Sequence, residues 1–185
     1  MLATIAPRHT APTLTVLCAA LLLSACAPMS ARYSQEQLPN AVKVPDGHQV
    51  AMQTVGVGKI AYECKARKDM TGHEWVFVGP DAVLNERSGM QVGTYAGPPA
   101  TWANLDGSKV TATQVAVAPA GAGNIPYQLV KANPATGSGA MQGVSYIQRV
   151  ATSGGVAPSS PCGMDTVGVK QWVPYQADYI FWKAA

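Results

Sequence analysis

Hydrophobic and polar residues alternate along most of this chain from about residue 48 onward, as expected for half-buried β-strands. The segment "KVTATQVAVAP" at 109–119 alternates over nearly its whole length, and residues 59–64 place Ile60, Tyr62 and Cys64 on one face. Five further segments are rich in β-branched and aromatic residues and also predict strands: 48–55, 74–78, 143–152, 166–173 and 178–183.

Turn-forming pairs separate these segments at the spacing of an antiparallel β-protein: Asp46-Gly47, Asp106-Gly107, Asn133-Pro134 and Gly154-Gly155. With 18 glycines and 14 prolines, the chain leaves little room for long helices. The best helical candidate is residues 80–87, because Pro80 suits the first turn of a helix. We therefore predict an all-β fold over residues 45–185, a single antiparallel β-sandwich or barrel with at most one or two short helices.

The N-terminal region is predicted to be an export signal. The apolar run "TLTVLCAALLL" at 13–23 is much shorter than the ~20 residues of a membrane-spanning helix. It ends in Leu23-Ser24-Ala25-Cys26, which resembles the lipobox of bacterial lipoproteins. We predict that residues 1–25 are a signal peptide and that Cys26 carries the lipid anchor. The alternative is an ordinary secretory signal cut after the A-x-A-like site Ala25-Cys26-Ala27, which would release a soluble protein.

The lipobox also suggests where the protein resides. Ala27 follows the lipidated cysteine, and an alanine there usually permits export to the outer membrane, so we expect a cell-envelope protein facing the periplasm. Residues 26–44 lack a sustained period and are predicted to be a flexible tether. Cys18 leaves with the signal, so Cys64 and Cys162 remain as an even pair in an oxidising compartment and are predicted to form a disulfide.

Charge and motifs exclude several function classes. The formal net charge is only +3, charged residues make up 12 %, and no basic cluster exceeds "KARK" at 65–68, which argues against nucleic-acid binding. The chain has no phosphate-binding glycine loop, no G-x-S-x-G elbow and no H-E-x-x-H motif. We therefore expect no cofactor and no metal.

The stretch "VGTYAGPPATWANLDGS" at 92–108 is the strongest candidate for a binding region. Its glycines and prolines would make a rigid loop that holds Tyr95 and Trp102 beside Asp106. Such a loop would suit a carbohydrate or an aromatic small molecule. The favoured interpretation is a packed corner of the scaffold, in which the two rings are buried.

A catalytic role would have to use the few histidines that remain after processing. His73 could act as a general base with Glu74, Asp81 or Asp106 as its acidic partner, which would make the protein a periplasmic hydrolase. However, adjacent residues of a strand point to opposite faces, so Glu74 would not assist His73. We favour a lipid-anchored module with a non-catalytic binding or structural role, and keep the hydrolase as the alternative.

Five sequence blocks in order identify a resemblance: "IAYEC" at 60–64, "EWVFVGPDAVL" at 74–84, "VGTYAGP" at 92–98 with "DGS" at 106–108, "SYIQRVATSGGVAPSSPC" at 145–162, and "VPYQADYIFW" at 173–182. Together they resemble the bacterial and fungal family known as domain of unknown function 3455, from about Val44 to Lys183. The resemblance implies an exported protein with a paired Cys64 and Cys162, and it carries no activity. The chain has Thr94 where the family usually has histidine, and it inserts Pro99-Ala100 before Trp102.

Overall fold

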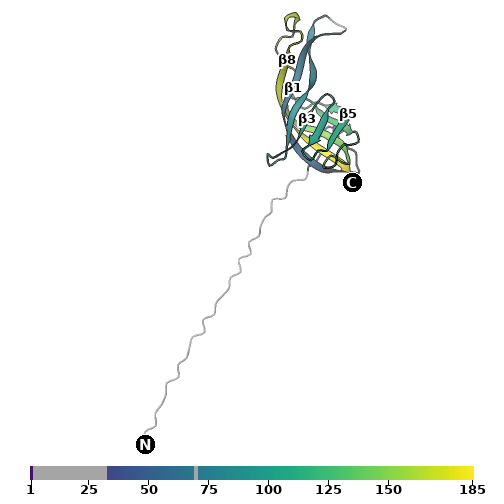
Figure 1. Ribbon diagram of the computed structural model, residues 1–185, viewed down its shortest axis with the longest axis vertical. Helices are drawn as coiled ribbons and strands as arrows, with labels where there is room; N and C mark the ends of the chain where they lie inside the picture. Colours follow the sequence, from purple (N-terminus) through teal and green to yellow (C-terminus); the bar gives the residue numbers. More distant parts are fainter. Residues whose placement is uncertain (2–32, 69–70) are drawn as a thin grey trace. The chain divides into compact units, whose positions relative to one another are not determined.

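The domain is a closed barrel of eight antiparallel strands in which each strand pairs with its neighbour in the sequence and β8 pairs with β1 (Figure 1). The computed structural model describes residue 1, residues 33–68 and residues 71–185. The strands are β1 (His48–Ala66), β2 (His73–Asn85), β3 (Gln91–Ala96), β4 (Thr101–Asn104), β5 (Lys109–Ala118), β6 (Tyr127–Ala132), β7 (Val144–Gly154) and β8 (Lys170–Ala184). The predicted all-β fold is confirmed, and the barrel is the form that it takes.

Helical structure in the described residues is limited to two short 3₁₀ turns, η1 (Asn40–Val42) and η2 (Met164–Thr166). None of the helices in this part of the chain is long or apolar enough to cross a membrane. The helix predicted at 80–87 is wrong, because this segment continues β2 and then enters a turn. Ala82 and Leu84 are buried while Val83 between them is exposed, so burial follows the period of a strand.

Aromatic side chains pack against one another in the core of the barrel, among aliphatic residues. Tyr95 and Trp102 lie opposite each other on β3 and β4 and stack with ring centroids 4.5 Å apart. Tyr179 of β8 packs against both rings, and its hydroxyl lies 3.1 Å from that of Tyr175. Gly56 of β1 makes room for Tyr179, because a Cβ at this glycine would lie 2.5 Å from the tyrosine ring. This core fixes the geometry of the barrel interior.

A second apolar cluster lies outside the barrel, beneath residues 33–44, which we call the strap. Val42 and Val44 of the strap are buried against Leu129, Ile180 and other residues of the outer face of the sheet. The tether predicted for residues 26–44 is therefore incorrect from Tyr33 onward, because these residues pack against the barrel. Residues 26–32 lie outside the part of the chain that the structure describes.

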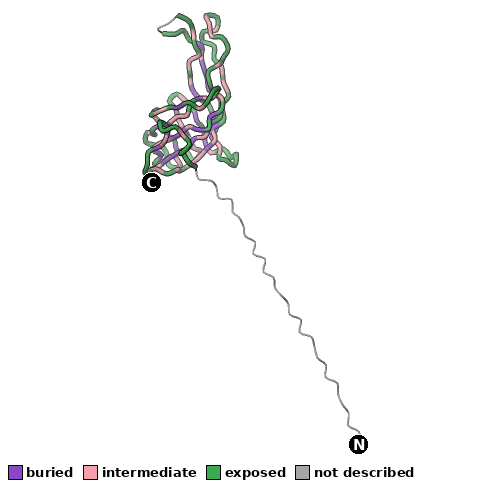
Figure 2. The backbone as a smooth tube through the Cα atoms, turned by 180° about the vertical axis from the view of Figure 1, so that it is seen from behind, coloured by how far each residue is buried: buried purple, intermediate pink, exposed green. Residues whose placement is uncertain are grey.

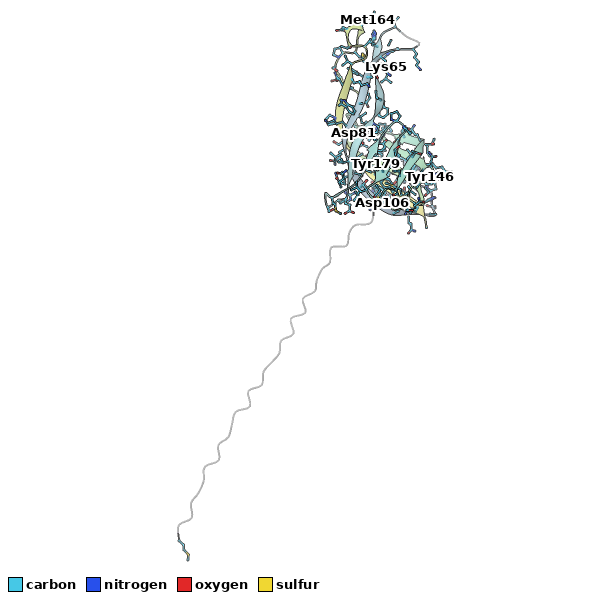
Figure 3. The ribbon with its side chains drawn as sticks, in the orientation of Figure 1. Lys65, Asp81, Asp106, Tyr146, Met164 and Tyr179 are labelled. Atoms are coloured by element: carbon cyan, nitrogen blue, oxygen red, sulfur yellow. A yellow bond between two sulfur atoms is a disulfide. The ribbon has the colours of Figure 1, made fainter. Side chains whose placement is uncertain are left out.

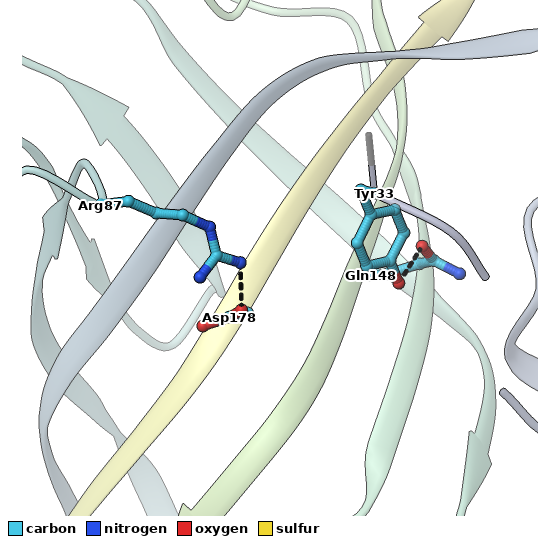
Figure 4. Close-up of polar contacts among 4 residues, drawn as sticks. All are labelled: Tyr33, Arg87, Gln148 and Asp178. Atoms are coloured by element: carbon cyan, nitrogen blue, oxygen red, sulfur yellow. Dashed lines mark hydrogen bonds and ion pairs between the residues drawn. The ribbon is translucent and has the colours of Figure 1, made fainter. Parts of the chain in front are cut away.

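One buried glutamine anchors the strap. The side-chain carbonyl of Gln148, on β7, accepts a hydrogen bond from the Tyr33 hydroxyl at 3.2 Å (Figure 4). It also accepts one from the Trp182 indole at 2.9 Å. Its amide group donates to the Val42 carbonyl at 2.6 Å and to the Gln35 side chain at 3.1 Å. Every polar atom of this fully buried side chain thus has a partner, as a buried amide requires.

Three strands extend past one end of the barrel and form an arm. Residues 61–66 of β1 pair with β2, and residues 61–63 also pair with β8. In contrast, β3 joins β2 only from Asp81, and β7 joins β8 only from Tyr175. The extension of β1 and β8 beyond the barrel is visible in Figure 1, and Figure 2 shows that the loops at its end are mostly exposed.

The segment between β7 and β8 folds over the arm and is held there covalently. The predicted disulfide between Cys64 and Cys162 is confirmed, with Cα atoms 5.6 Å apart. Two hydrogen bonds support the same segment: the Tyr62 hydroxyl donates to the Gly155 carbonyl at 2.8 Å, and the Trp75 indole donates to the Ser160 carbonyl at 2.9 Å.

Candidate functional site

A cavity of about 200 Å³ lies at the mouth of the barrel, at the end from which the arm extends. An eight-stranded barrel has an interior that side chains can fill or that can hold one small ligand, so this position is a natural place for a site. We call it the mouth cavity. It is lined by Phe77, Pro80, Tyr95, Gly97, Pro98, Ala100, Trp102, Ala112, Gln114, Gln128, Val130 and Arg149.

Tyr95 and Trp102 form the wall of the mouth cavity that adjoins the core. Both rings are buried, with exposed fractions of 5 % and 1 %. This favours the packed-corner interpretation of residues 92–108, because an exposed loop would leave the rings accessible. The indole N–H of Trp102 has no hydrogen-bond partner among the described residues. Burial raises the pKa of Tyr95, and the nearby charge of Arg149 partly opposes that rise.

Arg149 supplies the positive charge of the mouth cavity. It lies on β7 opposite Gln128 of β6 and Tyr179 of β8, on the face of the sheet that lines the barrel. Its guanidinium group donates from Nε at 3.2 Å and from an Nη at 2.9 Å to the carbonyl of Pro126. The ion pairs found in the described residues do not include Arg149. The cavity therefore holds a cation with N–H donors to spare.

Two glutamines and a phenylalanine complete the rim. The side-chain amide of Gln128 donates to the side-chain carbonyl of Gln114 at 2.7 Å. The side-chain amide of Gln114 and the side-chain carbonyl of Gln128 take no part in this bond. Phe77 comes from the arm, contacts Tyr62 edge to face at 6.1 Å and is 55 % exposed. The aromatic lining therefore comes from the adjacent strands β2, β3 and β4, and the polar lining comes from β5, β6 and β7.

Asp106 does not belong to this site. It lies in the turn between β4 and β5, and Figure 3 shows it at the end of the barrel away from Lys65 and the rest of the arm. Its carboxylate accepts hydrogen bonds from the hydroxyl and backbone N–H of Ser108 and from the N–H of Ala140. These bonds lower the pKa of Asp106, first through the Ser108 hydroxyl. The residue joins two loops and does not converge with Tyr95 and Trp102.

The residues of the hydrolase alternative do not gather at one site either. His73 lies at the outer end of the arm opposite Ala66, and Glu74 pairs with Arg67 at 3.6 Å. Asp81 lies eight positions along β2, which is about 26 Å at the usual rise per strand residue. The other described histidine, His48, packs against Tyr146 at the opposite end of β1. Within the described ranges no group of three metal-binding side chains gathers.

Tyr95 and Trp102 of the mouth cavity were predicted from the sequence, but its other aromatic and polar side chains were not: Phe77, Gln114, Gln128 and Arg149. A signal for Arg149 was present, because strand alternation in 143–152 places it on the same face as Ile147, a core residue. A charged side chain on the core face of a strand is a candidate functional residue. The lipidation site Cys26 lies outside the residues that the structure describes.

The comparisons with known proteins give a family and nothing narrower. The model of the family described as "Protein of unknown function (DUF3455)" matches residues 45–183, which is most of the chain. Neither the search of curated proteins nor that of solved structures found a match. The match agrees with the resemblance that the five sequence blocks indicate.

Proposed function

We propose, from the premise that the chain belongs to the DUF3455 family of proteins of unknown function, that it is a lipid-anchored binding module of the cell envelope. The ligand is a small aromatic molecule that occupies the mouth cavity. The observation that carries the proposal is a cavity of about 200 Å³ walled by Phe77, Tyr95 and Trp102 at the open end of a closed barrel.

The composition of the cavity wall favours an aromatic ligand over a carbohydrate. A sugar presents hydroxyl groups on most of its edges, and each needs a hydrogen-bond partner when it leaves water. The polar side chains of the wall are gathered on one side, at Gln114, Gln128 and Arg149. The remaining wall is suited to the face and edges of a ring, which pack against other aromatic rings. The volume limits the ligand to one ring or two fused rings.

The separation of the candidate catalytic residues supports a binding role over hydrolysis. A general base must lie within hydrogen-bond reach of the group that it deprotonates. His73 is at the far end of the arm, and the residues that line the mouth cavity include no histidine and no carboxylate.

Removing the exposed ring at the rim should weaken ligand binding without unfolding the barrel. Phe77→Ala is expected to weaken the binding of benzyl alcohol by roughly three- to tenfold, the value of one aromatic contact. The measurement is an NMR titration that follows the indole N–H resonance of Trp102. Trp172→Ala is the matched control, because Trp172 is 54 % exposed and lies opposite Ala61, on the other face of the arm from Phe77. Equal affinities for both variants and the wild type would contradict the proposal.

The anchoring part of the proposal rests on Leu23-Ser24-Ala25-Cys26. Cys26→Ala removes the thiol that would carry the lipid, so the protein should move from the membrane fraction to the soluble periplasmic fraction. Immunoblotting of fractionated cells measures the change, and Cys18→Ala serves as the control because Cys18 lies within the predicted signal. A wild-type protein that is already soluble would mean that the lipobox is not used.

A further inference from the structure

The guanidinium group of Arg149 is the most unusual feature of the mouth cavity. Its position on the inner face of β7 places a permanent positive charge among aromatic rings. The side chain is only partly accessible, and two of its donors are used on one neutral acceptor, the carbonyl of Pro126. A partly buried cation is costly unless an anion or several acceptors balance it. The described residues provide no carboxylate for Arg149.

The positive charge of Arg149 affects the pKa of several tyrosines. Arg149 acts to lower the pKa of Tyr62, Tyr95 and Tyr179, against the larger effect of burial, which raises the pKa of each. These tyrosines lie on β1, β3 and β8, so the charge of Arg149 acts on residues of three different strands. An anion entering the cavity would meet this potential with no acidic side chain in the cavity wall to oppose it.

We infer that the mouth cavity selects a small aromatic carboxylate, with the ring against Phe77, Tyr95 and Trp102 and the carboxylate on Arg149. This deepens the proposed function and rests on it. The guanidinium group presents its donors in a planar fork that matches the two oxygens of a carboxylate. The amide of Gln114, whose carbonyl is engaged by Gln128, is placed at the same polar side and can donate to the same anion.

The selectivity is tested with two probes of nearly equal size, benzoate and benzyl alcohol, on the full chain at neutral pH. Because hydrogen bonds between charged groups are stronger than those between neutral groups, we expect benzoate to bind the wild type about tenfold more tightly or better. In Arg149→Gln the affinities for benzoate and benzyl alcohol should become about equal, and benzyl alcohol should still bind. Retained binding of benzyl alcohol shows that the variant is folded and that its cavity is intact.

A second cation provides the matched control. Arg87 pairs with Asp178 at 2.7 Å on the outer side of the barrel (Figure 4). It does not line the mouth cavity. Arg87→Gln removes the same formal charge, so it should leave the preference for benzoate unchanged. Arg149→Lys should keep part of the preference, because lysine keeps the charge but loses the planar fork.

The outcomes separate the inference from the proposed function. If the wild type binds benzyl alcohol but binds benzoate no better, or if Arg149→Gln keeps the preference, the carboxylate selectivity is wrong and the aromatic site stands. If the wild type binds neither probe, the aromatic site itself is wrong. A loss of preference in Arg87→Gln as large as that in Arg149→Gln would assign the effect to overall charge and would also overturn the inference.

Discussion

Trp102→Ala is expected to lower the free energy of unfolding by roughly 3–5 kcal/mol, the usual cost of removing a buried aromatic ring. Trp102 is 1 % exposed, stacks on Tyr95 and contacts the ring of Tyr179 edge to face. Its removal leaves a cavity in the core, because the neighbouring rings are held in place by the strands that carry them. For a domain of this size, the melting temperature should fall by roughly 10–15 °C. Thermal unfolding followed by near-ultraviolet circular dichroism measures the change.

Trp102→Phe is the control for this prediction. It keeps an aromatic ring in the stack and removes only the second ring with its N–H, which has no hydrogen-bond partner in the described structure. The loss in stability should therefore be well below that of Trp102→Ala, because no hydrogen bond is broken and less volume is removed. If Trp102→Ala melts at the wild-type temperature, the ring does not support the barrel and the packed-corner interpretation is wrong.

The alternation of hydrophobic and polar residues was sufficient to predict the strands, but it could not distinguish a barrel from a sandwich. Both folds bury one face of every strand, so both produce the same alternation. Closure depends on β1 pairing with β8 from His48↔Ala184 to Glu63↔Lys170, across almost the whole chain. No local window contains that information.

Two segments show how tertiary contacts override local preference. Residues 80–87 have a composition compatible with a helix, yet β2 needs Ala82 and Leu84 inside the barrel, and Gly58 allows the backbone of Ala82 to come close. Residues 33–44 show no periodicity because the strap is irregular and is held by a few side chains. Its contacts lie on the outer face of the barrel, on apolar residues such as Leu129 and Ile180 that are distant from it in the sequence.

Only part of the candidate site could be predicted from the sequence, again because tertiary contacts bring distant residues together. Tyr95 and Trp102 attract attention because they lie close together in a glycine- and proline-rich stretch. Phe77 and Arg149 come from β2 and β7, and only closure of the barrel brings them to the same cavity. Asp106 was grouped with the two rings because it is near in sequence. However, the β4 hairpin places it at the other end of the barrel.

Loss of the Cys64–Cys162 disulfide should have an effect comparable to that of losing Trp102. The bond joins residues separated by 98 positions, and closing a loop of ~100 residues contributes roughly 4–5 kcal/mol in the chain-entropy model. Backbone bonds of Cys64 with Val169 and Gly168 hold the same segment without the sulfur atoms. We therefore expect the double variant Cys64→Ala/Cys162→Ala to fold and to lose about 2–5 kcal/mol of unfolding free energy.

Denaturant unfolding of this variant in a Cys26→Ala background measures the effect, since Cys26 is then not available to form other bonds. The matched control is the Cys26→Ala protein with the disulfide intact, measured with and without reductant. Reductant should lower the stability of that control to the level of the double variant and should leave the double variant unchanged. If reduction of the control has no effect on the unfolding midpoint, the covalent bond does not constrain the unfolded chain as proposed. The arm would then be held by Trp75, Tyr62 and the backbone bonds of Cys64 alone.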